Sequence, residues 1–238
     1  MSVFKGFFEI IFVKIFKQLI MKRVFITALI ACFASISVNA QDTTTENNNE
    51  FTRLQLRLRA LAVVPNESAT IEVIGGDVDI SNAYIPELDI TYFFTENIAA
   101  ELILGTSKHD VGAVATAVGN IDLGSVRLLP PTLTAQYHFN GDIIKPYVGA
   151  GVNYTLFYDV DSGPVADAIN YDNSIGFAVQ LGFDFNITDR WILNIGAKYL
   201  WLSTDVTINA TSALGATVGA EVNINPFIAG FGVGYKLF

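Results

Sequence analysis

The chain contains two histidines and one cysteine, so few side chains could serve as a catalytic base or nucleophile. His109 is followed directly by Asp110, and His138 lies near a short turn, but neither has a serine partner at a recognisable spacing. Nucleophilic catalysis needs a positioned nucleophile beside a base. The sequence also contains no cluster of metal ligands and no phosphate-binding loop. We therefore expect no enzyme, no metal and no cofactor, which leaves binding or passage of a molecule.

Charged and amide side chains alternate with other residues in several segments, so they share one face of the predicted strands. If this face lines a narrow barrel, the charges must pair, because an unpaired buried charge is costly. The candidate polar plug consists of Arg53, Arg57, Arg59, Glu101, Gln136, Asp184 and Lys198. Asp89 is a further acidic partner for the arginines.

The same face becomes apolar towards the other end of the strands. The candidate apolar lumen consists of Leu61, Val63, Ile103, Leu128, Leu200, Leu202 and Ile228. An apolar funnel above a paired plug suits a small hydrophobic molecule. The alternative is that these residues only fill the interior, because eight strands leave room for little more than side chains or one small ligand.

Period-two alternation, which indicates β-strands, positions these residues. Eight runs near the roughly 9–11 residues of a tilted spanning strand cover 51–64, 86–95, 97–106, 126–140, 144–158, 174–187, 190–205 and 223–238. Tight turns at 95–97, 140–142 and 188–190 alternate with long loops at 65–85, 107–125, 159–173 and 206–222. This layout predicts an all-β fold, an eight-stranded antiparallel transmembrane β-barrel, with both termini in the periplasm and the long loops extracellular.

The composition agrees with a barrel that exposes apolar residues to lipid. Apolar residues make up 51% of the chain and charged residues 16%, against about 25% charged in a typical soluble domain. A soluble β-sandwich or lipocalin-like barrel is the alternative, but the eight runs lack a charged outer face. Aromatic residues gather near the strand ends, as in the interfacial girdles of membrane barrels. The net charge of −9 disfavours nucleic acid as a partner.

The N-terminal 40 residues are predicted to be an extended N-terminus and signal peptide. A basic Met21-Lys22-Arg23 segment precedes an apolar stretch and a small-x-small cleavage site that ends at Ala40. Lipidation of Cys32 is an alternative, because residues 29–32 match a lipoprotein cleavage box. Residues 41–50 are polar and form a predicted disordered linker, and residues 51–238 form the barrel.

Two motifs give the chain a resemblance to a known family. LPPTLTAQY at residues 129–137 is followed by KPYVGAGVNYT at residues 145–155. Shorter matches are TYF at 91–93, NIAAEL at 97–102, RW at 190–191, NPF at 225–227 and GYK at 234–236. Together they resemble the outer-membrane protein W (OmpW) family over about residues 51–238.

The resemblance implies a small barrel in the bacterial outer membrane, surrounded by lipid, with a hydrophobic channel for small apolar molecules. It also implies lateral discharge through the wall, for which Pro130 and Pro131 are the candidate gap because proline interrupts a strand ladder. The barrel-assembly machinery is an implied partner, although Phe238 is out of phase with Tyr235. The alternative function is a structural or adhesive surface barrel with a packed lumen.

Overall fold

The computed structural model describes residues 53–237, and everything below concerns this part of the chain. The predicted signal peptide with its cleavage site at Ala40, the linker at 41–50, and Phe238 lie outside the described residues. No helix within residues 53–237 is long and apolar enough to cross a membrane.

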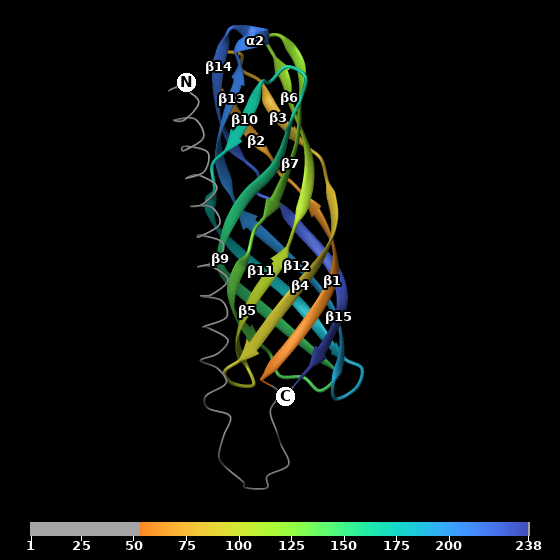
Figure 1. The fold of residues 1–238 in the computed structure, drawn as a ribbon. Coiled ribbons are helices and arrows are strands. Elements are labelled where there is room, and N and C mark those ends of the chain that lie inside the picture. The colour runs from red at the N-terminus through yellow and green to blue at the C-terminus, as the bar shows by residue number, and fades with distance from the viewer. Residues whose placement is uncertain (1–52, 238) are drawn as a thin grey trace, which may run out of the picture. The chain divides into compact units, whose positions relative to one another are not determined.

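Eight antiparallel strands close into a barrel (Figure 1), which confirms the predicted fold. In barrel order they are β11 (Ser174–Asn186), β12 (Trp191–Trp201), β15 (Phe227–Lys236), β1 (Leu54–Val64), β4 (Ala83–Phe93), β5 (Ile98–Gly105), β8 (Thr132–His138) and β9 (Ile144–Ser162). Pairing of β9 with β11 closes the ring. Closure satisfies the backbone hydrogen bonds of the ladders, as hydrocarbon requires.

The alternation of side chains along each strand decides which residues face lipid. In β1 the Leu58 side chain is 57% exposed, whereas its neighbours Arg57 and Arg59 are buried. In β11 the apolar Phe177 and Leu181 are exposed, and Gln180 between them is buried. A one-residue shift would reverse both faces, so the apolar outer face fixes the register. The barrel therefore has an apolar outer wall, and the charged and amide side chains of these strands face the lumen.

Most aromatic residues of the predicted girdles lie on the outer wall, but two do not. Trp191 packs edge-on against Tyr235 near one end of the barrel, and Tyr199 packs against Trp201 near the other. Phe93, one of the aromatic residues near the strand ends that predict a girdle, is buried and lies 4.7 Å from the His138 ring. Phe157 likewise points inward, because its strand continues beyond the barrel and packs against apolar residues there.

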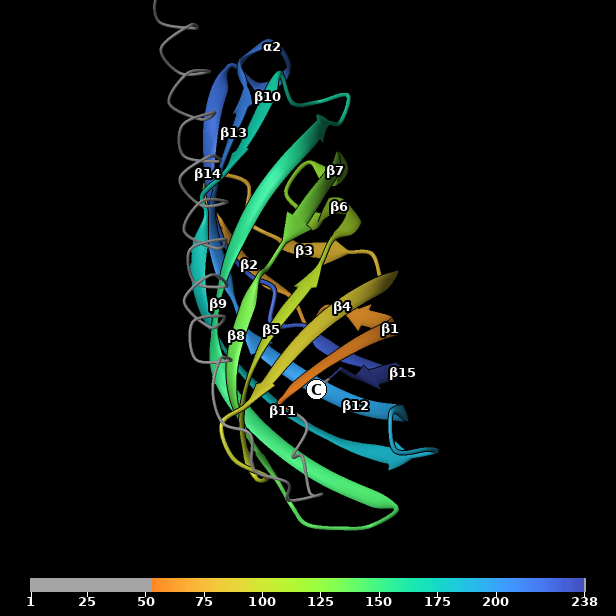
Figure 2. The same cartoon turned by 60° about the horizontal axis from the view of Figure 1, so that its bottom comes forward.

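The segments predicted as long loops are largely strands, so that prediction is wrong. They contain β2 (Ser68–Ile71), β3 (Asp77–Ile80), β6 (Ser107–Thr116), β7 (Gly119–Leu129), β10 (Ala168–Tyr171), β13 (Ser203–Ala210), the short helix α2 (Thr211–Leu214) and β14 (Ala216–Asn223). These elements form one end of the molecule, here called the extension (Figures 1 and 2). The short turns lie at the opposite end, here called the turn end.

The extension consists of two sheets that are not joined by a strand ladder. One sheet has the order β10-β13-β14-β2, and the other continues the barrel through β9, β7, β6 and β3. Phe157 of β9 stacks on Tyr171 of β10 with ring centroids 5.4 Å apart. Side chains therefore close the seam between β9 and β10.

The interior holds two apolar clusters. The lower cluster lies within the barrel and contains Leu61, Val63, Ala83, Ala178, Leu200 and Ile228. The upper cluster lies within the extension and includes Val78, Val111, Val126, Leu128, Leu202, Val206, Ile208 and Val218. Of the predicted apolar lumen, Leu128 and Leu202 therefore belong to the extension, while Leu61, Val63, Leu200 and Ile228 belong to the barrel.

Candidate functional site

Arg57 holds the part of the charged network nearest the turn end. Its guanidinium lies 2.9 Å from Glu101 Oε2 and 2.8 Å from Asp184 Oδ2, so it bridges β5 and β11 across the lumen. The same group lies 4.9 Å from the centre of the Tyr147 ring. Arg57 and Glu101 are fully buried. Salt bridges on both sides supply the compensation that a buried guanidinium needs.

Arg59 forms a second layer of ion pairs, which lies two residues along β1 from Arg57 and nearer the extension. Its Nη2 lies 2.5 Å from Glu87 Oε1, and its Nε lies 2.7 Å from Asp89 Oδ2. Lys198 of β12 forms an ion pair with the other oxygen of Glu87. Glu87 therefore joins β4 to cations on β1 and β12. Of these acidic partners, Glu87 was not predicted, although its spacing of two residues from Asp89 places both on one strand face.

Uncharged polar side chains complete the network. Gln136 donates to both oxygens of Glu101 at 2.7 Å, and the His138 ring lies 2.8 Å from Gln136 Oε1. Asn194 donates to Asp184 at 2.7 Å and to the Tyr147 hydroxyl at 3.1 Å. These hydrogen bonds and the ion pairs join side chains of different strands, which fixes the strands relative to one another.

Tyr147 fits into the lumen only because a glycine faces it. A Cβ added at Gly182 would lie 2.5 Å from the Tyr147 ring. A side chain there would force either the tyrosine or the strand to move. The Tyr147 ring therefore packs over Gly182, its partner in the ladder between β9 and β11.

The structure brings together all but one of the predicted plug residues. Arg57, Arg59, Glu101, Gln136, Asp184 and Lys198 are each at most 6% exposed. Arg53 is exposed and precedes β1 at the turn end, so its place in the plug is a wrong prediction. The alternation of side chains does place Arg53 on the plug face, but its position lies beyond the end of the barrel.

An apolar cavity of about 40 Å³ lies directly above the plug. Glu87 and Lys198 form its floor, and its walls include Val63, Ile103, Leu200 and Ile228. We call this the lower cavity. Its chemistry is that of an apolar chamber with one charged end.

A second apolar cavity, also of about 40 Å³, lies in the extension. Its walls include Ile71, Val78, Val111, Leu123, Val206 and Ile208. Phe157 and Tyr171, the stacked pair at the seam, also line this upper cavity. Leu128 and His109 line both cavities, so the two are adjacent.

His109 is the polar group at this junction. Its Nδ1 lies 2.6 Å from the Ser81 carbonyl oxygen, and its Nε2 lies 2.9 Å from Ser107 Oγ. Burial lowers the pKa of His109, which belongs to β6 of the extension rather than to a barrel strand. A serine partner was not expected from the sequence. The sequence pattern predicts a loop at residues 107–125, whereas in the observed strand Ser107 and His109 share a face.

The barrel wall has an interruption beside the lower cavity. Pairing of β4 with β5 ends at Glu87 and Gly105, and backbone hydrogen bonding resumes where Ser81 N–H donates to the Asp110 carbonyl. Between these points, within the described residues, β4 has a ladder only with β1. Pro86 contributes no N–H there. The half-buried Ile85 fills the interruption from β4 and contacts the Gly105 position.

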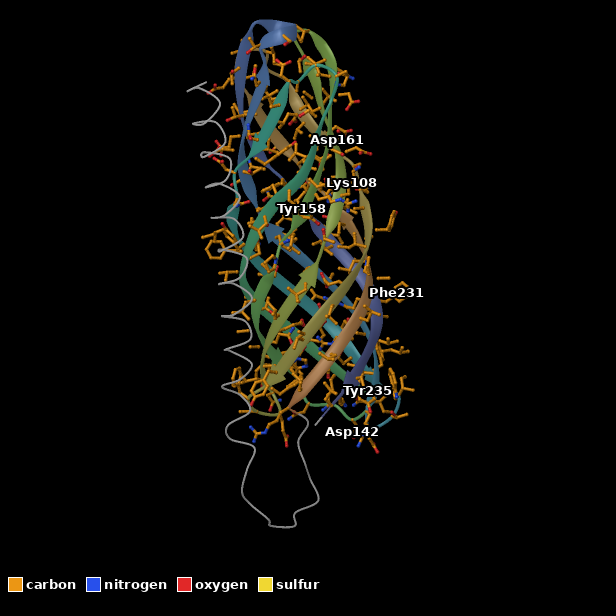
Figure 3. The ribbon with its side chains drawn as sticks, in the orientation of Figure 1. Lys108, Asp142, Tyr158, Asp161, Phe231 and Tyr235 are labelled. Atoms are coloured by element: carbon orange, nitrogen blue, oxygen red, sulfur yellow. The ribbon has the colours of Figure 1, made fainter. Side chains whose placement is uncertain are left out.

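A groove of about 800 Å³ lies on the lipid-facing side of β4 and of its neighbours β1, β15 and β12. Small residues, Ala60, Ala62 and Ala229, line it together with the larger Tyr84 and Phe231. Figure 3 shows Phe231 directed away from the barrel. Ile85 lines both this groove and the lower cavity, so it lies between the lumen and the lipid-facing side.

Pro130 and Pro131 lie between β7 and β8, close to the lower cavity. Thr132 Oγ1 donates to the Pro130 carbonyl at 2.9 Å, and Tyr154 N–H donates to the Pro131 carbonyl at 3.1 Å. The chain therefore stays bonded to β9 at this point. The longer interruption lies at Ile85 and Pro86, and a proline within the second predicted strand was its signal in the sequence.

Comparisons with known proteins agree with this architecture. The sequence profile of the OmpW family matches residues 50–237. An uncharacterised outer-membrane protein of Sinorhizobium fredii, y4mB, is 44% identical over 76% of this chain and 79% of its own length. Outer membrane protein W of Vibrio cholerae is 33% identical over 76% of this chain and 87% of its own. The crystal structure of OprG from Pseudomonas aeruginosa superposes with a TM-score of 0.73 at 28% identity, covering 78% of this chain and 96% of that chain.

These matches extend across the barrel, the plug and the extension rather than a single motif. The relatives are named as outer-membrane proteins, which agrees with the apolar outer wall and its aromatic girdles. The chain is a β-barrel of the bacterial outer membrane and belongs to the OmpW family.

Proposed function

We propose that this protein is a passive conduit for small hydrophobic molecules. The observation that carries the proposal is the pair of adjacent apolar cavities above a buried charged plug. Apolar walls offer a small hydrophobic solute a path that excludes ions, because an ion would lose its hydration there without gaining partners.

We place the extension outside the cell and the turn end in the periplasm. Outer-membrane barrels have short periplasmic turns and longer extracellular segments, and β1 begins and β15 ends together at the turn end through the Leu237 to Leu54 backbone bond. A solute would then enter the upper cavity first and reach the lower cavity past Leu128.

The plug favours an exit through the wall rather than into the periplasm. Arg57, Glu101 and Asp184 fill the lumen below the lower cavity with bonded charges. Beside Ile85 the wall between β4 and β5 has no ladder, and Ile85 also lines the lipid-facing groove. Lateral release into lipid also suits an apolar solute, which is favoured in hydrocarbon.

The cavities are small, so passage requires side-chain motion. Each holds about 40 Å³, far below the roughly 300 Å³ of a pocket for a drug-sized ligand. The seam between β9 and β10, which side chains close without a ladder, is a place where the upper cavity can widen. This requirement limits the solutes to small, flexible or flat molecules.

An uptake assay tests the conduit. Cells that lack or express the protein are given naphthalene and a hydrophilic probe of similar size. We expect faster entry of naphthalene alone, and a several-fold loss of that effect in Leu200→Trp, which fills the lower cavity. The control is Ile195→Trp, on the same strand but facing lipid with 55% exposure.

The rival function is a structural or adhesive barrel with a packed lumen, which the small cavity volumes favour. Equal naphthalene uptake with and without the protein would support that rival and refute the conduit. We propose no enzymatic role. His109 is oriented by the Ser81 carbonyl and not by a carboxylate, so it lacks the acidic partner of a catalytic triad.

A further inference from the structure

Ser107 and His109 form a polar station at the junction of the two cavities. They are two residues apart on β6, so both point inward, and they are 6% and 3% exposed. Ser107 lines the lower cavity, while His109 lines both. Around the junction stand Leu128, Leu202 and Ile224, all apolar.

The hydrogen bonds fix which atom at the station carries each proton. The Ser81 carbonyl oxygen can only accept, so His109 Nδ1, at 2.6 Å, must donate to it. In a neutral imidazole the other nitrogen is then an acceptor. His109 Nε2 therefore accepts from the Ser107 hydroxyl, whose oxygen lies 2.9 Å away. Burial, which lowers the pKa of His109, favours this neutral form.

The one hydrogen-bonding capacity that the polar station does not use is the capacity to accept a hydrogen bond. Both ring nitrogens of His109 are engaged, and the Ser107 hydroxyl has given away its hydrogen. The Ser107 oxygen still has lone-pair capacity to accept a hydrogen bond. A solute that only accepts, such as a ketone, would have to displace Ser107 from His109 and leave Nε2 without a donor.

We propose that Ser107 Oγ accepts a hydrogen bond from a passing solute, so that the conduit prefers small aliphatic alcohols to hydrocarbons and ketones of the same shape. This inference rests on the proposed conduit and names its substrate class. The alkyl chain packs against the apolar walls, and the hydroxyl lies at the junction. A net hydrogen bond of ordinary strength gives a preference of about two- to tenfold.

Competition for protein-dependent uptake tests the preference. Cells expressing the full chain take up naphthalene in the presence of 2-heptanol, 2-heptanone or heptane, and cells without the protein supply the background from lipid. We expect half-inhibition by 2-heptanol at a concentration about two- to tenfold lower than by the other two. Ser107→Ala should remove this difference, and Ser107→Thr, which retains a hydroxyl, should restore it.

A matched variant separates Ser107 from the other hydroxyl in the lower cavity. Thr132 also lines that cavity, and its hydroxyl donates to the Pro130 carbonyl. We expect Thr132→Val to keep the preference for 2-heptanol. Loss of the preference in Thr132→Val, or its survival in Ser107→Ala, would overturn the assignment to Ser107.

The two proposals fail in different ways. Protein-dependent naphthalene uptake with equal competition by all three compounds overturns the alcohol preference and leaves the conduit intact. Absence of any protein-dependent uptake overturns the conduit and this inference together.

Discussion

Arg57 shows how strongly a single side chain in the lumen is constrained. It is fully buried and faces two carboxylates, Glu101 and Asp184, from different strands. Removing one partner of such a network leaves the others as uncompensated buried charges. The buried network also holds more carboxylates than cations, with Arg57, Arg59 and Lys198 facing Glu87, Asp89, Glu101 and Asp184. Loss of a cation should therefore be especially damaging.

We predict that Arg57→Met lowers the free energy of unfolding by about 3 to 5 kcal/mol, the usual effect of breaking a buried ion pair. Urea unfolding of the barrel in lipid vesicles measures it. Arg127→Met is the control, because Arg127 and Asp159 form an exposed pair with side chains 40% and 69% exposed. Such a pair contributes at most about 1 kcal/mol. Equal effects of the two substitutions would contradict a stabilising role for the plug network.

His109 predicts a dependence of stability on pH. Burial lowers its pKa in the folded protein, against weaker opposing effects of the Ser81 carbonyl, Asp110 and Glu67. As pH falls below the ordinary histidine value of about 6.5, the unfolded chain binds a proton that the folded protein resists. Stability should therefore fall on the acidic side of that value and show no His109 effect above it.

The comparison with His109→Gln isolates this effect from other titrating groups. The free energy of unfolding is measured for both proteins at neutral pH and at about one unit below the histidine value. We expect the wild-type protein to lose more stability than the variant over this interval. A steeper loss in the variant would show that His109 is protonated more readily when folded.

At the scale of elements, the sequence predicts the barrel strands well and the extension poorly. For β11 the predicted range of 174–187 matches the observed Ser174–Asn186 closely, because a long alternating run of Phe, Val and Leu is unambiguous. β13 also alternates, with Val206, Ile208 and Ala210 buried. It is short, however, and its outer face is polar, so it looks like part of a loop. β13 is held in place by ladders with β10 and β14, and the local sequence pattern does not predict these pairings.

The contrast between the barrel strands and the extension also explains which site residues can be predicted from the sequence. The plug residues occupy barrel strands with an apolar outer face, so the alternation alone places Arg57, Glu101 and Asp184 on the inner face. Ser107 and His109 belong to β6, which lies in a segment taken for a loop, and the junction between the cavities was therefore missed. Ile85 was missed for a related reason, because the predicted strand began at residue 86 and β4 begins at Ala83.

At the scale of the whole molecule, the complete and interrupted strand ladders of the barrel wall determine the path that we propose for a solute. Ladders surround the plug on all sides, since β9 pairs with β11 to complete the ring. The wall beside the lower cavity is weaker, because β4 above Glu87 is bonded only to β1. A solute that has reached the lower cavity thus meets buried ion pairs below and, at the side, the interrupted wall where Ile85 lies.

We predict that Ile85→Trp slows delivery of naphthalene into lipid several-fold and that Ile85→Ala speeds it, because Ile85 lines both the lower cavity and the lipid-facing groove and lies where the ladder between β4 and β5 is interrupted. Vesicles that contain the protein and brominated lipid report arrival, since naphthalene fluorescence is quenched once it enters the bilayer. Leu88→Trp, on the same strand and facing lipid, is the control. Unchanged quenching rates in both Ile85 variants, with Leu200→Trp still inhibiting, would place the exit elsewhere. The charged plug would then have to open, and Arg57→Met should accelerate passage.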